Sequence, residues 1–430
     1  MLGFSSSVRG RGHGSVILGP VNVHIIRDVG QDDLGGLVET TPIPGARELF
    51  SLDPEVIQLN HGSYGAVPVE VQERQAELRA EMERMPDRFF ARLPARLAAA
   101  RERVAAFLNS SGAAFVANAT EGVAVALESV PLAAGDEILY TDHGYAAVER
   151  ALRRRAGESG ARLVRVALGD DPVTAVLGGV GARTRVAVLD HVSSAGARLL
   201  PVARLAGELA ARDVVTVVDG AHASGMLPVD LDAVNADFWV GNLHKWAFAP
   251  RPAALLHVAP RWRGRVRPLV VSYGEGFPDA VEFQGTRDYT ALLAAPYGLD
   301  LLERLGLERV RAHNTALAAY GQRVVAESLH EAGLCADAPG TREECSQTDV
   351  GHPGVPMRVV RLASGLGPTK AEADALCAEI LDRLGCQIKI EPVGLLRLSA
   401  QIYNTPEDYD RLAAGLPAVL RSRRGLLRAI

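Results

Sequence analysis

A lysine and an aspartate, each at the end of an apolar segment, are the residues of this chain best suited to chemistry. Lys245 lies near the end of the segment 238–246, which reads Phe-Trp-Val-Gly-Asn-Leu-His-Lys-Trp, and Asp219 follows the apolar run 214–218. Two such runs are typical of neighbouring strands, so the amine and the carboxylate would meet at one sheet edge. This pair suits pyridoxal phosphate (PLP), which forms a Schiff base with a lysine and pairs its pyridine nitrogen with a carboxylate.

The carboxylate matters because its charge raises the pKa of the pyridine nitrogen and keeps that nitrogen protonated. The pyridinium then accepts the electron pair that remains when a bond at the substrate Cα breaks. Alone, Asp219 would be interpreted as a turn residue and Lys245 as a solvated surface residue. Together, at the ends of two apolar strands, they favour a catalytic pair.

The segments Asp219-Gly-Ala-His222 and Gly241-Asn-Leu-His-Lys-Trp246 resemble those of the class V aminotransferase family of fold-type I PLP enzymes. The closest resemblance is to the isopenicillin N epimerase-like branch, and it covers residues 59–403. It implies a homodimer with a shared active site. It also implies that His222 donates to the phenolic oxygen of the cofactor or orients the aspartate.

The elements that must position these residues alternate regularly. Apolar strands alternate with amphipathic helices after Ala95, which predicts an α/β fold with a mostly parallel sheet, seven-stranded by the resemblance, and helices on both faces. The loops at the carboxyl ends of the strands should build the site. We expect four parts: an N-terminal extension (1–45), a segment joining the small domain (46–95), a large PLP-binding domain (96–305) and a small C-terminal α/β domain (306–430).

A cradle for the phosphate is predicted where a strand ends and a helix begins, near residue 120. Thr120 offers a hydroxyl and an N–H, and Glu121 and Gly122 offer N–H groups at a helix N-terminus, where the helix dipole favours an anion. A threonine at this position could also serve only as a helix cap. The nearby PLP lysine favours phosphate binding. The resemblance adds two residues near the phosphate, Asn242 and His244.

Two further loops bear on the cofactor ring. The resemblance places a flat side chain from the loop after the next strand over the pyridine ring, and both His143 and Tyr145 could stack there. At the end of another strand, Ser193 or Ser194 resembles the residue that bonds the phenolic oxygen. The alternative for this serine pair is an ordinary turn.

The C-terminal segment 395–404 resembles the family motif in which an arginine binds the substrate α-carboxylate through a bidentate fork. We assign this role to Arg397 and expect its side chain to face inward. The resemblance also places Asn60 and the backbone of Gly62 on the substrate side.

The segment 284–288 resembles one that reaches across a dimer interface. In that arrangement Thr286 touches the phosphate held by the partner subunit, and Arg287 lies near the partner's site. If the segment acts in this way, the monomer is inactive.

The composition argues against several other classes of protein. The chain has 430 residues, 48% of them hydrophobic, and its net charge of −5 with no basic stripe gives no sign of nucleic-acid binding. No apolar run approaches the roughly 18 residues of a membrane span. Without a signal-peptide pattern, the cytoplasm is the expected location. None of the four cysteines forms a CxxC pair or joins a histidine cluster, so we expect neither a metal site nor a disulfide framework.

The cysteines also argue against a desulfurase, which in this class presents a mobile cysteine in a loop. Cys377 lies in an expected helix and Cys386 begins an expected strand, while Cys345 lies in a polar loop and is the one exposed candidate. The epimerase-like branch contains isopenicillin N epimerases and C–S lyases that act on cysteine conjugates in ergothioneine and lincosamide biosynthesis. Both begin with bond cleavage at Cα, for which Lys245 is the natural base.

We favour C–S cleavage by β-elimination from a cysteine S-conjugate, with epimerisation as the alternative and decarboxylation or transamination as further variants. The content of Ala, Arg, Leu and Gly is typical of high-GC bacteria, where such enzymes serve specialised metabolism, including antibiotic biosynthesis. An epimerase needs a second acid on the opposite ring face, and three candidates are open: Tyr64, Tyr273 and Tyr289. A pseudo-enzyme is disfavoured by the intact lysine, aspartate and arginine.

Overall fold

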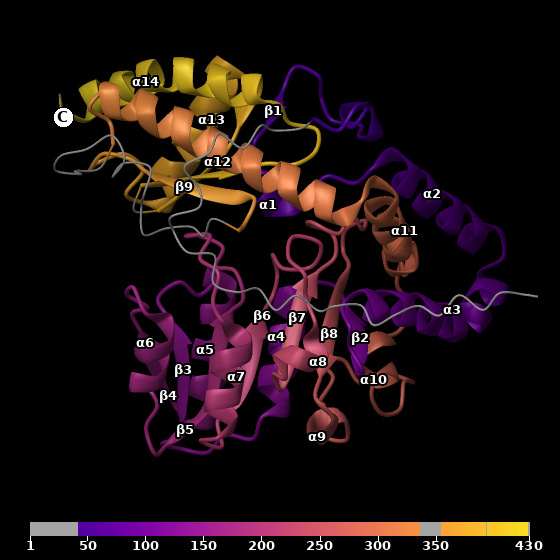
Figure 1. Ribbon diagram of the computed structural model, residues 1–430. Helices are drawn as coiled ribbons and strands as arrows, with labels where there is room; N and C mark the ends of the chain where they lie inside the picture. Colours follow the sequence, from indigo (N-terminus) through magenta and orange to yellow (C-terminus); the bar gives the residue numbers. More distant parts are fainter. Residues whose placement is uncertain (1–41, 336–353, 393, 429–430) are drawn as a thin grey trace, which may run out of the picture. The chain divides into compact units, whose positions relative to one another are not determined.

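A mixed sheet of seven strands forms the centre of the computed structural model, which describes residues 42–335, 354–392 and 394–428 (Figure 1). The strand order is β2-β8-β7-β6-β5-β3-β4. The strands are β2 (Ala113–Val116), β3 (Glu137–Thr141), β4 (Arg162–Val166), β5 (Thr184–Asp190), β6 (Val215–Asp219), β7 (Phe238–Asn242) and β8 (Ala254–Val258). Most of the predicted N-terminal extension, and Cys345, lie outside the described residues.

The predicted, mostly parallel sheet is confirmed. Strands β4, β3, β5, β6 and β7 are parallel, whereas β8 runs antiparallel to both β7 and β2. The direction of β8 could not be predicted, because an apolar run looks the same whichever way the strand runs. The parallel strands end at one edge of the sheet, which brings Asp190, Asp219 and Asn242 to the same side.

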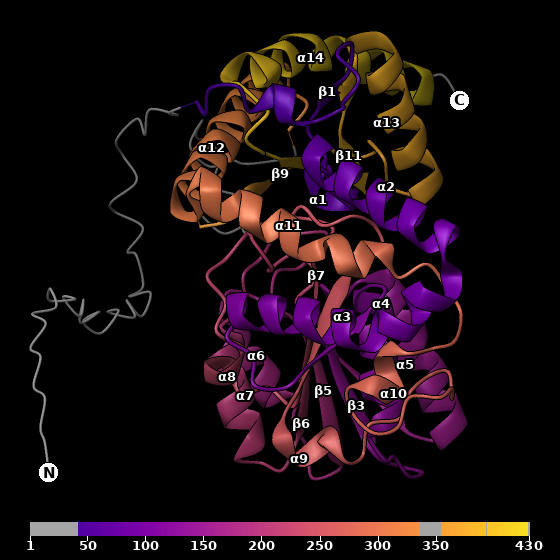
Figure 2. The same cartoon turned by 90° about the vertical axis from the view of Figure 1, so that its right-hand side faces the viewer.

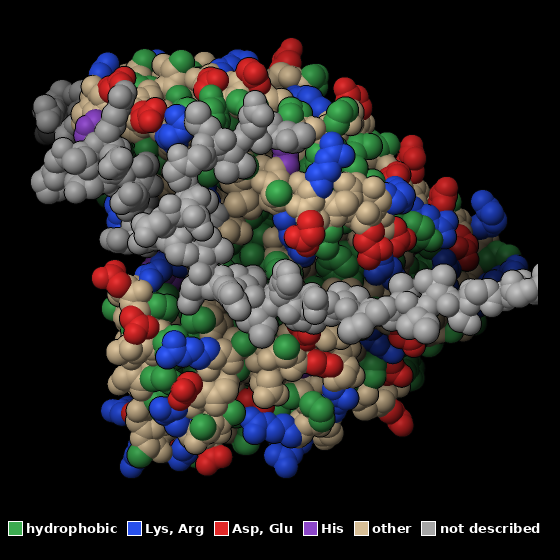
Figure 3. Space-filling model, viewed as in Figure 1, with side chains coloured by type: hydrophobic (Ala, Val, Ile, Leu, Met, Phe, Trp, Pro, Cys, Tyr) green, Lys and Arg blue, Asp and Glu red, His purple; other side chains and the backbone are tan. Residues whose placement is uncertain are grey.

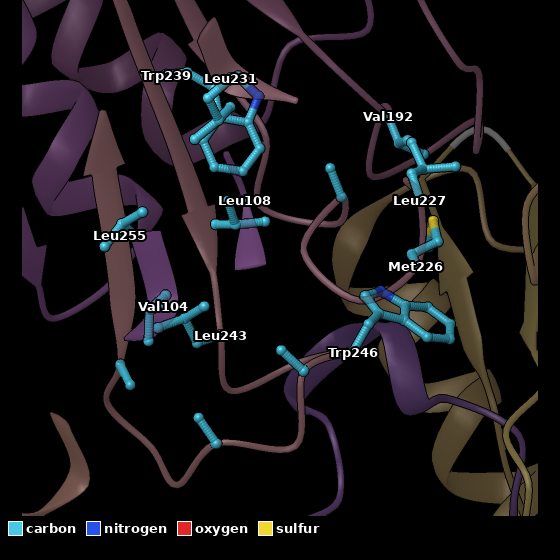
Figure 4. Packing of buried hydrophobic residues seen from close by; sticks show 14 of the residues in the cluster. Val104, Leu108, Val192, Met226, Leu227, Leu231, Trp239, Leu243, Trp246 and Leu255 are labelled. Atoms are coloured by element: carbon cyan, nitrogen blue, oxygen red, sulfur yellow. The ribbon is translucent and has the colours of Figure 1, made fainter. Parts of the chain in front are cut away.

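Helices cover both faces of this sheet, as predicted. Val217 belongs to a hydrophobic cluster on one face, and its neighbour Val218 belongs to the cluster on the other, as the period of two in a strand requires. The first cluster includes α4 (Ala119–Ser129) and α5 (Ala146–Ser159); the second, part of which is drawn in Figure 4, includes α3 (Pro86–Phe107), α6 (Pro172–Gly178), α7 (Val202–Ala210) and α11 (Thr290–Leu305).

A second, smaller sheet follows in the sequence, with the order β11-β12-β9. Its antiparallel strands are β9 (Met357–Arg361), β11 (Lys389–Glu391) and β12 (Leu395–Ser399), and they pack with α12 (Leu307–Glu331), α13 (Lys370–Leu384) and α14 (Pro406–Arg428). The early strand β1 (Ile57–Gln58) pairs with β10 (Cys386–Gln387), so the chain before the main sheet contributes to this region. The division into domains at residues 45, 95 and 305 stays a prediction.

The remaining helices are short, apart from α2 (Val69–Arg84). Helix α2 packs against α3 and α11 beside the main sheet (Figure 2). In chain order, these helices are η2 (Arg47–Leu49), α1 (His61–Tyr64), α2 (Val69–Arg84), α8 (Leu231–Val234), α9 (Pro260–Arg263) and α10 (Asp279–Glu282).

On the face drawn in Figure 3, basic and acidic side chains are interspersed. In the described ranges, no helix combines the length and the apolar character needed to cross a membrane. Cys377 lies in α13 and Cys386 in β10, as predicted. Cys335 is disulfide-bonded, a bond that the sequence spacing did not predict.

Candidate active site

Lys245 differs from the other two lysines of the chain, Lys370 and Lys389. Those two pair with Asp374, at 3.6 Å for the Lys389 Nζ. Lys245 lies in the loop after β7, with its Nζ 3.2 Å from the Nε2 of His222. Burial, together with the positive charge of Arg397, lowers the pKa of Lys245 to about 7, although the charge of Asp219 opposes the shift. At neutral pH, a large share of this amine is therefore unprotonated and nucleophilic.

Asp219 ends β6 and is buried. One carboxylate oxygen accepts the Ala221 N–H at 2.9 Å. Burial raises the pKa of Asp219, and Asp190, in register with it on β5, has a pKa raised by burial and by the charge of Asp219. Within the described chain, no side chain donates a hydrogen bond to Asp219. A buried carboxylate without a paired cation fits the protonated nitrogen of PLP.

His222 lies beside the lysine rather than beside the aspartate. Its Nδ1 accepts the indole N–H of Trp246 at 3.4 Å, and its Nε2 faces Lys245. The possibility that His222 orients Asp219 is therefore wrong in this structure, because both ring nitrogens have other partners. Burial and the nearby Lys245 hold the pKa of His222 well below its usual value, so the ring is neutral.

The predicted phosphate cradle needs a correction. Asn118 caps α4: its side-chain oxygen accepts the Glu121 N–H at 2.9 Å, and its carbonyl oxygen accepts the Gly122 N–H at 3.1 Å. Glu121 and Gly122 were predicted to donate these N–H groups to the phosphate, but both groups are already used inside the helix. Thr120 is exposed, and its hydroxyl and N–H are the donors of this turn that remain for an anion.

The other two predicted phosphate residues lie around this helix start. Asn242 is buried, and its side-chain oxygen accepts the Ala119 N–H at 2.8 Å. His244 places its Nδ1 2.8 Å from the carbonyl oxygen of Ala253, and burial lowers its pKa to about 4. Asn242 thus joins the end of β7 to the start of α4, and His244 joins the loop after β7 to Ala253. Contact of either residue with the phosphate stays a prediction.

The structure separates the two candidates for ring stacking. His143 is partly buried, and a Cβ added at Gly196 would lie 2.9 Å from its Nδ1, so the ring packs closely on that loop. Tyr145 is 47% exposed at the start of α5. A stacking side chain must lie in the interior with the lysine and the aspartate. The geometry therefore favours His143.

The two serines have different neighbours. Ser193 is buried, and its hydroxyl oxygen accepts the Arg198 N–H at 3.1 Å and lies 3.5 Å from the Nδ1 of His143. Ser194 instead accepts hydrogen bonds from Arg397 through its carbonyl oxygen and its hydroxyl. We therefore assign Ser193 to the ring side of the site and Ser194 to the carboxylate side.

Arg397 faces inward, as predicted. It is 2% exposed in β12, and its Nη2 donates to the Ser63 hydroxyl at 2.8 Å and to the Asn60 side-chain oxygen at 3.2 Å. Its Nη1 lies 3.5 Å from the carboxylate of Glu391, and its buried Nε has no hydrogen-bond partner in the described residues. Most of its contacts are to neutral oxygens, which a substrate carboxylate could replace with a stronger charged pair.

The segment around α1 (His61–Tyr64) adds site residues that the sequence did not predict. His61 is buried, with its Nε2 3.0 Å from the backbone oxygen of Lys245 and its Nδ1 3.0 Å from the Tyr403 hydroxyl. Gly62 was predicted to offer its backbone to the substrate, but its N–H donates to Ser399 at 3.2 Å, so that role needs correction. Ser63, three residues after Asn60, was missed although that spacing places both on one helical turn.

In the segment 284–288, which was predicted to reach across a dimer interface, Arg287 contacts residues of its own chain. Arg287 donates to Gln284 at 3.2 Å and lies over the Tyr289 ring, with 4.9 Å from its guanidinium carbon to the ring centroid. Thr286 is exposed. Contact of either residue with a partner subunit stays a prediction.

The low pKa of Lys245 predicts how the apoprotein captures PLP. Since only the neutral amine attacks an aldehyde, the rate of Schiff-base formation should rise as pH increases through about 7 and level off above that. A lysine with an ordinary pKa would instead keep gaining rate up to pH ~10. Stopped-flow absorbance of PLP mixed with apoprotein at pH 5.5 to 9 measures this profile. A rate still climbing steeply at pH 9 would contradict the assignment.

Replacement of Arg397 by alanine is predicted to raise KM for amino-acid substrates by about 10²-fold, because a buried charged pair is lost. PLP content should change little, since the side chain contacts Ser194, Asn60 and Ser63 rather than the lysine. Arg287→Ala is measured beside it as the next candidate for the carboxylate site. Steady-state kinetics and a PLP titration separate the two effects, and a normal KM in Arg397→Ala would move the carboxylate site to Arg287.

The chain is similar to known proteins in both sequence and fold. A family model described as Aminotransferase class-V matches residues 66–412. The chain is 32% identical over 408 residues to isopenicillin N epimerase from Streptomyces clavuligerus, covering 87% of this chain and 97% of that protein. It is 29% identical to a probable chloroplastic L-cysteine desulfhydrase from Arabidopsis thaliana, covering 86% of this chain and 84% of that protein. A solved structure of a C-DES mutant, with glycine covalently linked to the PLP cofactor, has a TM-score of 0.72 at 19% identity and covers 88% of this chain and 99% of that chain.

These comparisons confirm two predictions. The structural match supports the fold-type I architecture, with its mostly parallel central sheet and flanking helices. The family match and the PLP-containing neighbour support PLP as the cofactor. The relatives include both an epimerase and a desulfhydrase, so they do not choose between the two reactions.

Proposed function

Because the chain belongs to the class-V aminotransferase family, whose cofactor is PLP, we propose that it is a lyase that cleaves the C–S bond of a cysteine S-conjugate. The observation that carries the proposal is the buried amine of Lys245, whose pKa is lowered to about 7 and which can therefore act as a base. One base can remove a proton from Cα, which is all that β-elimination requires. A two-base epimerase needs a second acid on the other side of Cα.

The three tyrosines considered for that second acid are poor candidates within one subunit. Tyr64 is 74% exposed and Tyr273 is 91% exposed. The hydroxyl of Tyr289 donates to the carbonyl oxygen of Gly285 at 2.7 Å, and burial raises its pKa. Among the described residues, no hydrogen bond joins any of these tyrosines to the Lys245 amine, which supports elimination over epimerisation.

Each residue of the site has a separate role in the proposed reaction. When bound, PLP accepts the electron pair left at Cα. Arg397 binds the substrate carboxylate, and Ser63 and Asn60 fix the direction of its guanidinium. Lys245 Nζ takes the Cα proton, the Cβ–S bond breaks, and the sulfur leaves with its electron pair and gains a proton to form a thiol. Water then hydrolyses the remaining enamine to pyruvate and ammonia, so the step needs no oxidant or reductant.

We also propose that the enzyme works as a homodimer with shared active sites. Leu269, Val270, Val271 and Tyr273 form an exposed apolar segment shortly before Thr286. An apolar surface of this kind is typical of a protein–protein contact. Burial of this segment by a second copy would bring Thr286 and Arg287 to the interface. A specialised-metabolic role and a cytoplasmic location are further proposals from the sequence.

The reaction is tested by incubating the holoenzyme with S-alkyl-L-cysteines in deuterated water. Release of pyruvate, ammonia and thiol in equal amounts is the expected result. Deuterium at Cα with inversion and no pyruvate would replace the lyase with an epimerase, which the 32% identical relative favours. Carbon dioxide release would identify a decarboxylase, and accumulation of the pyridoxamine form would identify a transaminase.

A further inference from the structure

The indole of Trp246 makes a hydrogen bond that constrains the ring next to the catalytic lysine. Its Nε1 donates to the Nδ1 of His222 at 3.4 Å, and both side chains are buried, at 2% exposure each. An indole N–H can only donate, so Nδ1 must be the accepting nitrogen of the imidazole. A neutral imidazole carries one proton, and that proton must therefore be on Nε2.

The position of this proton determines what His222 can do to Lys245. The Nε2 lies 3.2 Å from the lysine Nζ. An Nε2–H can donate only to a nitrogen that has a lone pair, and an ammonium group has none. The donor on His222 therefore favours the neutral amine of Lys245 and disfavours its protonated form.

We propose that Trp246 is a positioning residue: its indole N–H holds His222 as the Nε2–H tautomer, which directs a proton donor at the Lys245 Nζ and keeps that lysine a neutral amine. The inference deepens the proposed function and rests on Lys245 as the Schiff-base lysine. It does not depend on which bond of the substrate is cleaved.

The orientation of Trp246 is fixed by its surroundings. Its ring lies 4.8 Å, centroid to centroid, from the ring of His61, which is itself bonded to the Lys245 backbone. The backbone of Trp246 is held as well, because it packs so closely on Gly225 that an added Cβ there would lie 2.4 Å from the Trp246 carbonyl oxygen. Figure 4 shows the indole beside Met226 in the hydrophobic cluster. The indole N–H therefore has little freedom to point elsewhere.

The other titratable and charged groups near Lys245 and His222 do not determine the tautomer of His222. Arg397, from β12, lowers the pKa of both Lys245 and His222, and Asp219, from β6, raises that of the lysine. His61, from α1, is neutral because burial lowers its pKa to about 3. None of these groups selects a tautomer of His222, whereas the Trp246 N–H does.

The chain contains a matched control for this interaction. Trp239 is also buried, and its Nε1 donates to the Nδ1 of a different histidine, His191, at 3.2 Å. Figure 4 shows Trp239 and Trp246 at separate places in the cluster. Trp239→Phe therefore removes the same kind of hydrogen bond from a core histidine other than the one that faces Lys245.

The test measures the pH midpoint at which the apoprotein captures PLP, with the product trapped by borohydride. Trp246→Phe should shift this midpoint upward from about 7 by up to about one unit, or ~1.4 kcal/mol, the net value of one hydrogen bond. Trp239→Phe should leave it unchanged. In a His222→Phe background, Trp246→Phe should give no further shift, because the ring that transmits the effect is gone.

A direct readout covers the case in which Trp246→Phe does not fold. The ¹⁵N NMR shifts of His222 in the wild-type protein, assigned by comparison with His222→Phe, should identify the Nε2–H tautomer. An Nδ1–H tautomer, or equal midpoints in Trp246→Phe and Trp239→Phe, would overturn the inference. If Lys245→Ala captured PLP as the wild type does, the proposed function would fail instead, so the two failures are distinguishable.

Discussion

Replacing Lys245 by alanine is expected to lower turnover by at least about 10³-fold and to remove the absorbance of the PLP Schiff base. The reason is that no other amine occupies the site: the remaining lysines, Lys370 and Lys389, pair with Asp374. The buried amine, with its pKa near 7, is both the nucleophile for the aldehyde and the proposed base. Absorbance spectra and steady-state kinetics of the purified variant measure both losses.

The matched control is Lys389→Ala, which removes a lysine from the small sheet and should keep both the spectrum and the rate. A Lys245→Ala protein with turnover within a few-fold of wild type would show that another group forms the Schiff base. Circular dichroism of each variant excludes unfolding as the cause of a loss.

Replacing Asp219 by alanine is expected to reduce kcat by about 10²-fold or more while some PLP binding remains. Without the carboxylate, the pyridine nitrogen loses its proton and becomes a poor electron acceptor. The structure gives this carboxylate one backbone N–H partner, from Ala221, and no cation in contact, so its charge is available to the ring. The rate and the PLP content should be measured together.

Two variants separate charge from shape at this position. Asp219→Asn keeps the size but removes the charge and should resemble alanine in rate, whereas Asp219→Glu should retain more activity. A rate within a few-fold of wild type in Asp219→Asn would show that the carboxylate does not act as the partner of the ring nitrogen.

The main sheet could be predicted from the sequence because each strand is marked by an apolar run within one short segment. Nearly continuous apolar runs such as 214–218 are typical of strands buried on both faces, and the residue after each run marks the edge where the site lies. The predicted inward direction of Arg397 is also confirmed. The placement of Lys245, Asp219 and His222 near one another follows from this topology.

The sequence could not predict how backbone donors are shared. Glu121 and Gly122 were assigned to the phosphate, but the Asn118 cap uses the first N–H and the helix uses the second, a choice made in three dimensions. The role of His61, which bridges Lys245 and Tyr403, depends on contacts between residues far apart in the chain. A pattern within one segment carries no information about such contacts.

The central claim is that Lys245 holds the cofactor, and mapping the borohydride-reduced holoenzyme by mass spectrometry tests it most directly. Reduction turns the Schiff base into a stable secondary amine, and three lysines could carry it: Lys245, Lys370 and Lys389. We predict one pyridoxyl group per chain, on the peptide that contains Lys245. A pyridoxyl group on Lys370 or Lys389 with Lys245 unmodified would contradict the claim.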